Sequence, residues 1–293
     1  MLPIGWFGFG SGVLADAEGV ANVARTAEEL GFDSVWVGEH PVLIDPHQPP
    51  SPLPSHSELM DPVPVLAYAA AVTSRITLGT GIVILPLRNP VILAKELATI
   101  DVLSQGRLEV GIGVGYVPGE YDAIGVPFQT RGRRADEWID ALRTLWRDEQ
   151  PELRGEFASF GGIQCRPQPH RPGGPPIIGS GMATAARRRC VARCDGWYGF
   201  YLDLDNTKAA IDELESLGQE VDRPADLGKL QITVTPVPGP IDADTVRRYE
   251  DLGVDRLVVV QDFGDMAGGP DAVRRGKFLD EMAACAERLD IRC

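Results

Sequence analysis

Nearly continuous hydrophobic stretches alternate along the chain with stretches whose hydrophobic residues recur at helical spacing. The first pair is residues 2–10, which have the pattern of a strand, and residues 16–31, where Val20, Val23 and Ala27 fall on one face of a helix. Short, continuously hydrophobic strands are typical of a parallel sheet that is covered by helices. The pattern therefore predicts an α/β fold built from repeated strand–helix units.

The alternation continues to the end of the sequence. Further strands are predicted at residues 33–38, 76–84, 107–115, 175–181, 195–201, 230–237 and 255–261. Further helices are predicted at residues 61–74, 89–106, 130–146, 183–194, 206–218, 242–253 and 278–289. A proline-rich loop at residues 39–60 and a loop at residues 152–175, with a candidate hairpin at 154–165, interrupt the rhythm. Eight β/α units in a chain of 293 residues predict a (β/α)8 TIM barrel, with residues 1–293 as a single domain.

An open Rossmann-type sheet is the rival arrangement, because it also alternates strands and helices. Its fingerprint places a third glycine three residues after a Gly-x-Gly pair that ends the first strand. Gly8, Gly10 and Gly12 lie at the end of the first predicted strand without a further glycine at that spacing, and residues 111–115 fail the same test. The barrel is therefore preferred.

Charge and cysteine content narrow the class of protein. The net charge of −14 argues against a nucleic-acid-binding surface, which is normally basic, so the arginines at 131–134 and 187–189 are expected to form solvated helix faces. No hydrophobic run approaches the roughly 18 residues of a membrane span, and no signal peptide is evident at the N-terminus. Cys190 and Cys194 are expected to be buried on one face of a helix. We therefore expect a cytoplasmic protein without nucleic-acid or membrane partners.

Glycines gather where several of the predicted strands end. Glycines alternate with other residues in the segments 8–12, 79–81, 111–115 and 179–181. In a (β/α)8 barrel, the carboxyl ends of the strands form the ligand site. Glycine at these positions would let a ligand lie close against the backbone, so the pattern predicts the ligand site there.

Gly179, Ser180 and Gly181 form the most chemically suggestive of these turns. They lead into the predicted helix 183–194, whose N-terminus presents backbone N–H groups and the positive end of the helix dipole. Ser180 could add a hydroxyl donor. The turn predicts a phosphate site, with a simple strand-to-helix connection as the alternative.

Polar candidates follow the second and fourth predicted strands. Glu39 and His40 come directly after the second strand, and an imidazole at the mouth can exchange protons with a substrate. Tyr116 and Glu120 follow the fourth strand and could face the same mouth. A metal-dependent hydrolase would need His47 beside Glu39 and His40, but the histidines lack ligand spacing, and no metal site is predicted.

Three segments together resemble a known family. They are AEELGFDSVWVGEH at residues 27–40, RITLGTGIVILPLRNPVILAKELATIDVLSQGRLEVGIGVGY at residues 75–116, and RRADEWIDALRTLW at residues 133–146. These segments resemble the bacterial luciferase-like superfamily, which comprises flavin-dependent monooxygenases and coenzyme F420-dependent oxidoreductases on a TIM barrel. The resemblance extends from the first strand to about residue 198 and implies an oxidoreductase.

The resemblance also implies where the cofactor lies. Its tricyclic ring would cross the end of the third strand, above a non-proline cis peptide between Gly81 and Ile82, with Thr80 beside it. Gly113 and Gly115 would run along the ring.

Two further assignments come from the resemblance. The turn at Gly179, Ser180 and Gly181 would receive the cofactor phosphate. Glu39 and His40 would be the catalytic pair near the redox face.

The cofactor itself is open between two candidates. The glycine and proline pattern around residues 79–90 and the arginine-rich composition favour F420, with hydride transfer on a small organic substrate. The alternatives are an FMNH2-dependent monooxygenase, which would need a flavin reductase as partner, and a non-catalytic flavin-binding relative. Members of the superfamily are often dimers, so a homodimer is expected.

Overall fold

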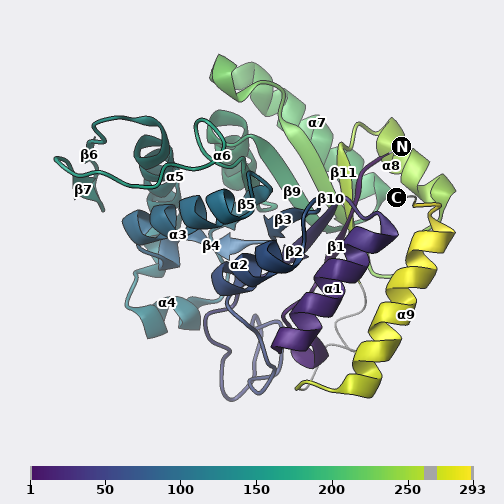
Figure 1. Ribbon diagram of the computed structural model, residues 1–293. Coiled ribbons are helices and arrows are strands. Elements are labelled where there is room, and N and C mark those ends of the chain that lie inside the picture. Colours follow the sequence, from purple (N-terminus) through teal and green to yellow (C-terminus); the bar gives the residue numbers. More distant parts are fainter. Residues whose placement is uncertain (1, 261–268, 292–293) are drawn as a thin grey trace.

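Parallel strands close into a barrel, and helices form a layer around it (Figure 1). The computed structural model describes residues 2–260 and 269–291. The barrel strands are β1 (Ile4–Phe7), β2 (Ser34–Val37), β3 (Thr77–Thr80), β4 (Val83–Ile84), β5 (Leu108–Gly113), β8 (Ile177–Ser180), β9 (Gly196–Leu202), β10 (Gln231–Pro236) and β11 (Arg256–Val260). The helices are α1 (Ala17–Leu30), α2 (Pro62–Val72), α3 (Pro90–Leu103), α4 (Pro118–Ile124), α5 (Arg131–Arg147), α6 (Thr184–Arg193), α7 (Leu204–Glu220), α8 (Ala243–Asp251) and α9 (Ala272–Arg288).

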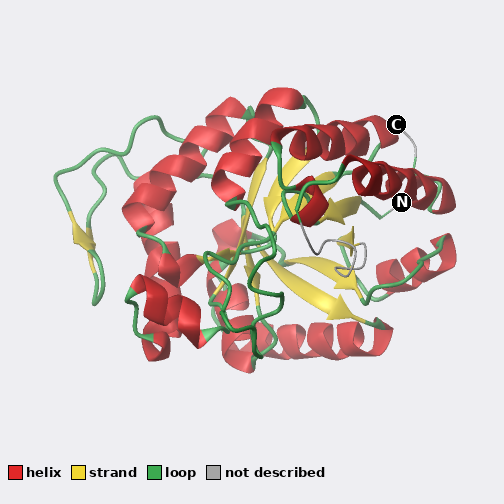
Figure 2. Ribbon diagram, turned by 90° about the horizontal axis from the view of Figure 1, so that it is seen from below, coloured by secondary structure: helices red, strands yellow, loops and turns green. Residues whose placement is uncertain are grey.

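The order of the strands confirms the predicted (β/α)8 barrel. Within the described residues they run β3-β2-β1-β11-β10-β9-β8-β5-β4, and a further pairing of β3 with β5 closes the ring. Because β3 and β4 are the two halves of one barrel strand, the ring has 8 positions. Seen from the carboxyl ends of the strands, the helices enclose the strands (Figure 2).

Three details differ from the sequence prediction. The strand expected at residues 76–84 is divided into β3 and β4, and α4 was not foreseen because it is short and begins at a Val-Pro step. The last helix begins at Ala272, since the side chain of Asp271 accepts a hydrogen bond from the amide of Arg274 and caps it. The expected hairpin is present as β6 (Leu153–Arg154) and β7 (Ser159–Phe160).

The arginines of α6 link it to both neighbouring helices, so the expectation that they only form solvated faces was wrong. The ion pairs toward α5 and α7 are Arg189–Asp136, Arg193–Asp140, Arg187–Glu213 and Arg188–Glu220. Arg187 is buried, as are Cys190 in α6 and Cys194 directly after it, which confirms that the two cysteines are buried. Among the described residues, no helix is long and apolar enough to cross a membrane.

Residue 79, in the barrel wall, has to be glycine because the indole ring of Trp36 fills the space that a side chain would take there. A Cβ atom at Gly79 would overlap the indole ring of Trp36, which is fully buried. Trp36 in turn packs against Tyr198, with 5.3 Å between ring centroids, and shares a buried cluster with Phe7 and Val258. The first glycine of the Gly-Thr-Gly segment is thus a packing requirement of the barrel interior.

We expect Gly79→Ala to lower the free energy of unfolding by about 1–3 kcal/mol, since the added methyl group overpacks the barrel interior. Urea unfolding measures this change. Gly218→Ala is the matched control, because nothing lies within 4 Å of the Cβ position there and the residue is helical. The control should be neutral or stabilising by up to about 1 kcal/mol. Equal effects of the two substitutions would contradict the packing explanation.

Candidate functional site

The break between β3 and β4 shapes one wall of the barrel mouth. The amide of Gly81 donates to the carbonyl oxygen of Val37 at 2.7 Å, and the Thr80 hydroxyl donates to the carbonyl oxygen of Gly111 at 2.6 Å. The peptide bond between Gly81 and Ile82 is cis, which confirms the geometry that the family resemblance implied. Beyond this point the chain continues as β4, which pairs with β5 alone.

The glycines at the mouth are explained first by packing within the protein. A Cβ atom at Gly81 would lie 2.8 Å from a ring carbon of Phe7, and one at Gly113 would lie 2.7 Å from the side chain of Ile82. Gly115 adopts a φ of +64°, and a Cβ atom there would meet Ile84 at 2.8 Å. Contacts within the protein therefore account for these glycines, and a ligand is not needed to explain them.

His40 and Glu120 meet across the mouth, although 80 residues separate them in the sequence. His40 Nδ1 lies 2.9 Å from Oε1 of Glu120, whose carboxylate is fully buried, while the imidazole retains 18% of its exposed surface. The second oxygen of Glu120 has no hydrogen-bond partner. Three of the four polar candidates from the sequence thus lie together, because the Tyr116 ring is 6.0 Å from that of His40.

The surroundings of His40 and Glu120 disfavour the charged form of the neighbouring Tyr116 phenol. Burial, together with the nearby Glu120 carboxylate, raises the pKa of Tyr116 above its ordinary value. The phenol therefore remains protonated at neutral pH and can act only as a hydrogen-bond donor or acceptor. In this arrangement the imidazole of His40 is the side chain that could exchange a proton with a ligand.

Glu39 is turned away from His40, although the two are adjacent in the sequence. Its Oε2 accepts a hydrogen bond from the amide of Ile84 at 2.5 Å, and its Oε1 accepts one from Nε of Arg88 at 2.7 Å. Burial raises the pKa of Glu39, and the Arg88 guanidinium opposes this shift. The structure thus brings His40 together with Glu120, and not with Glu39 as the resemblance implied.

The turn at residues 179–181 leads directly into α6, as expected for a phosphate site. Ala183 is the N-cap residue of α6, and its side chain cannot accept hydrogen bonds from the amides of the first turn. A phosphate oxygen could take the place of the missing cap. The Ser180 hydroxyl does not point into the turn, since it donates to the carbonyl oxygen of Tyr198 at 2.9 Å.

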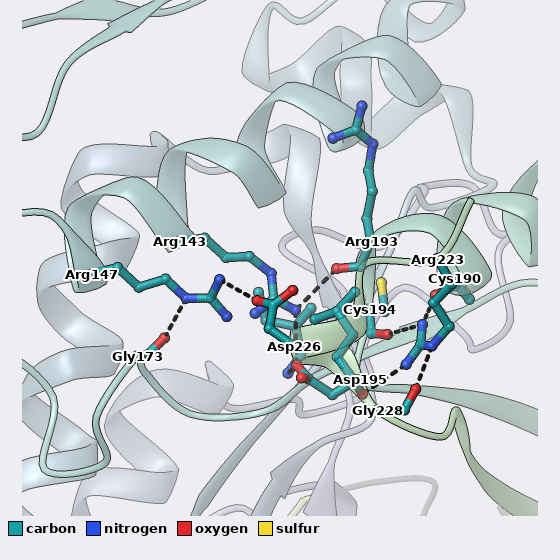
Figure 3. Close-up of polar contacts among 12 residues, drawn as sticks. Arg143, Arg147, Gly173, Cys190, Arg193, Cys194, Asp195, Arg223, Asp226 and Gly228 are labelled. Atoms are coloured by element: carbon teal, nitrogen blue, oxygen red, sulfur yellow. Dashed lines mark hydrogen bonds and ion pairs between the residues drawn. The ribbon is translucent and has the colours of Figure 1, made fainter. Parts of the chain in front are cut away.

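The opposite end of α6 is held by two arginines (Figure 3). Nη1 of Arg223 donates to the carbonyl oxygens of Val191 and Cys194, both at 2.8 Å. Nη2 of Arg143 donates to the side chain of Asp195 at 2.9 Å. It also donates to the carbonyl oxygen of Arg193 at 3.0 Å. Because both arginines satisfy carbonyls at the C-terminal end of α6, they fix the helix and the direction of its N-terminus.

Sequence reasoning missed two features of the mouth. Arg88 was part of a recognised motif but was not assigned a role, because nothing in the local sequence indicates that it reaches Glu39. Phe200 and Tyr201 stack with 4.3 Å between ring centroids, and Tyr201 has a φ of +58°. Neighbouring residues of a regular strand point to opposite faces, so this stack depends on an irregularity that composition does not reveal.

The three residues of the metal-hydrolase hypothesis have other contacts. His40 and Glu39 are engaged as described above, and a ring nitrogen of His47 lies 3.0 Å from the carbonyl oxygen of Ser51. In the part of the chain that the structure describes, no group of three His, Cys, Asp or Glu side chains could hold a metal ion. The arrangement gives the metal hypothesis no support.

Comparison with known proteins agrees with this architecture. Residues 7–258 match the model of a family described as luciferase-like monooxygenase. An uncharacterized protein of Mycobacterium tuberculosis is 33% identical over 282 residues, which cover 92% of each chain. An FMNH2-dependent dimethylsulfone monooxygenase of Pseudomonas fluorescens is 35% identical over 132 residues, 44% of this chain and 35% of that protein. The solved structure of an F420-dependent secondary alcohol dehydrogenase in complex with an F420–acetone adduct superimposes with a TM-score of 0.76, at 17% identity and coverage of 98% and 99%.

Proposed function

Because the chain belongs to the luciferase-like monooxygenase family, we propose that it is an oxidoreductase that uses coenzyme F420 for hydride transfer on a small organic substrate. The observation that carries the proposal is the His40–Glu120 pair at the barrel mouth. A hydride transfer at a substrate carbon requires a proton to be exchanged at a neighbouring atom, and this pair can exchange it.

His40 would act as the proton carrier, and Glu120 would orient it. Since Nδ1 faces Glu120, Nε2 is the ring nitrogen that can approach a substrate oxygen. A carboxylate beside an imidazole also stabilises the protonated ring, as in other histidine–carboxylate pairs. The buried position of Glu120 keeps water from competing for this contact.

The residues present fit a phosphate-bearing deazaflavin or flavin. The uncapped N-terminus of α6 would hold the phosphate, and the wall from Thr80 to Ile82, with Gly113 and Gly115, would lie along the ring. When bound, F420 supplies hydride transfer, and the protein supplies position and the proton.

One observation favours F420 over FMN. The histidine–carboxylate pair suits a reaction in which hydride and proton move together. The local identity with the FMNH2-dependent enzyme keeps FMN as the alternative, with a flavin reductase as partner.

Fluorescence titration of the purified protein with F420 and with FMN tests the choice of cofactor. We expect F420 to bind at least about tenfold more tightly than FMN, a difference of about 1.4 kcal/mol. Tighter binding of reduced FMN would support the monooxygenase alternative. Binding of neither cofactor would contradict the proposed function.

Ala183→Asp tests the assignment of the phosphate to α6. An aspartate at the N-cap should stabilise the helix by about 1 kcal/mol. It should also repel the phosphate and weaken F420 binding by about tenfold or more. Ala183→Asn is the control, because asparagine caps equally well without a charge. Equal affinities of the two variants would place the phosphate elsewhere.

A further inference from the structure

Among the strands that the structure describes, none lies beside the edge of β4 that faces β2. β2 pairs with β3 in parallel up to Val37 and Thr80, and the chain then leaves the sheet at Gly38. β4 pairs on its other side with β5, through Val83 and Ile84. A buried amide on an open edge needs a hydrogen-bond acceptor from somewhere else.

The side chain of Glu39 closes this edge. Its Oε2 accepts from the amide of Ile84 at 2.5 Å, so a carboxylate continues the ladder where the main chain of β2 has ended. The carboxylate retains only 3% of its exposed surface, and Ile84 is buried. A charge at this depth is stable only when it is paired and fully hydrogen-bonded.

Arg88 supplies the pairing and ties further segments to the same point. Its guanidinium contacts Oε1 of Glu39 through both Nε and Nη2, and Nη2 also donates to Asp61 at 2.6 Å. Asp61 caps the N-terminus of α2, at the end of the loop that begins after Glu39. The carbonyl oxygen of Arg88 accepts from Nε1 of Trp138 on α5 at 2.7 Å.

We propose that Glu39 and Arg88 are positioning residues that hold the β4 wall of the cofactor site, and that Glu39 takes no part in proton transfer. This inference rests on the proposed function. Both carboxylate oxygens of Glu39 are engaged by Ile84 and Arg88, so neither is directed to the mouth. His40 follows Glu39 directly, and therefore fixing Glu39 also fixes the point from which the imidazole reaches Glu120.

The barrel contains a second cluster of the same composition at its other end. Arg256, at the start of β11, donates to Oε2 of Glu109 at 2.6 Å and to Asp33 at 2.7 Å. Like the Arg88 cluster, it places one arginine between a glutamate and an aspartate in a largely buried setting. It lies at the amino ends of the strands, away from the mouth, and so provides a matched control.

The experiment compares Glu39→Gln and Arg88→Met with Glu109→Gln and Arg256→Met. For each variant, F420 and FMN affinities are measured by fluorescence titration, the absorption band of the bound cofactor is recorded, and Tm is determined. All four changes leave a buried partner unpaired, so all should lower Tm. We expect the mouth variants alone to weaken cofactor binding by about tenfold or more, which corresponds to about 1.4 kcal/mol. In these variants, the absorption band should also move toward its position in free solution.

Two further variants keep the test decisive. Arg88→Lys retains the charge but cannot contact two atoms of Glu39 at once, so its affinity should lie between those of wild type and Arg88→Met. The double variant Glu39→Gln/Arg88→Met should bind about as weakly as either single variant, because both remove the same contact.

The outcomes separate this inference from the proposed function. If wild type binds a cofactor but the mouth variants bind it equally well, the positioning role is wrong and the proposed function stands. If cofactor affinity falls in proportion to the decrease in Tm in all four variants, the positioning role is also wrong. If wild type binds neither cofactor, the proposed function fails, and the inference fails with it.

Discussion

The site depends on the unequal lengths of three neighbouring strands. β3 pairs with β2 as far as Thr80 and with β5 as far as Gly79, but β2 then ends, and the chain continues as β4 along β5 alone. The open edge that results is closed by a side chain, that of Glu39, rather than by main chain. From this arrangement follow the wall at Gly81 and Ile82, the course of the loop after Glu39, and the position of His40.

Two arginine-centred clusters hold the two ends of the barrel. At the amino ends of the strands, Arg256 joins β11 to Glu109 on β5 and to Asp33 before β2. At the carboxyl ends, Arg88 joins Glu39 and Asp61. Arginine suits both places because its planar guanidinium donates to two carboxylates at once. The buried cluster that contains Trp36 and Tyr198 lies in the barrel between these ends, so the mouth is built on a packed and not a hollow interior.

Much of the fold could be predicted from the sequence because it depends on local periodicity. The alternation of hydrophobic strands and amphipathic helices sufficed for the barrel, and Asn89 with Pro90 marked the start of α3. The division of the strand at residues 76–84 was not foreseen from periodicity, since a change of partner strand leaves the hydrophobic pattern intact. Similarly, Gly79 could not be distinguished from Gly81, because only the fold brings Trp36 against the first and Phe7 against the second.

Placing polar residues at strand ends selected His40, Tyr116 and Glu120, which the fold brings together, but their pairing spans two connections and cannot be read from spacing. The family resemblance paired Glu39 with His40, yet adjacent residues at the end of a strand point in opposite directions. Arg88 gave no signal of its own, since its partner Glu39 lies 49 residues earlier in the chain, after the end of β2.

A crystal structure of the protein grown with F420 tests the central claim most directly. The account predicts the deazaflavin ring against the wall from Thr80 to Ile82, the phosphate at the first turn of α6, and His40 facing the ring while it contacts Glu120. A ring bound away from this wall, or a phosphate far from α6, would contradict it.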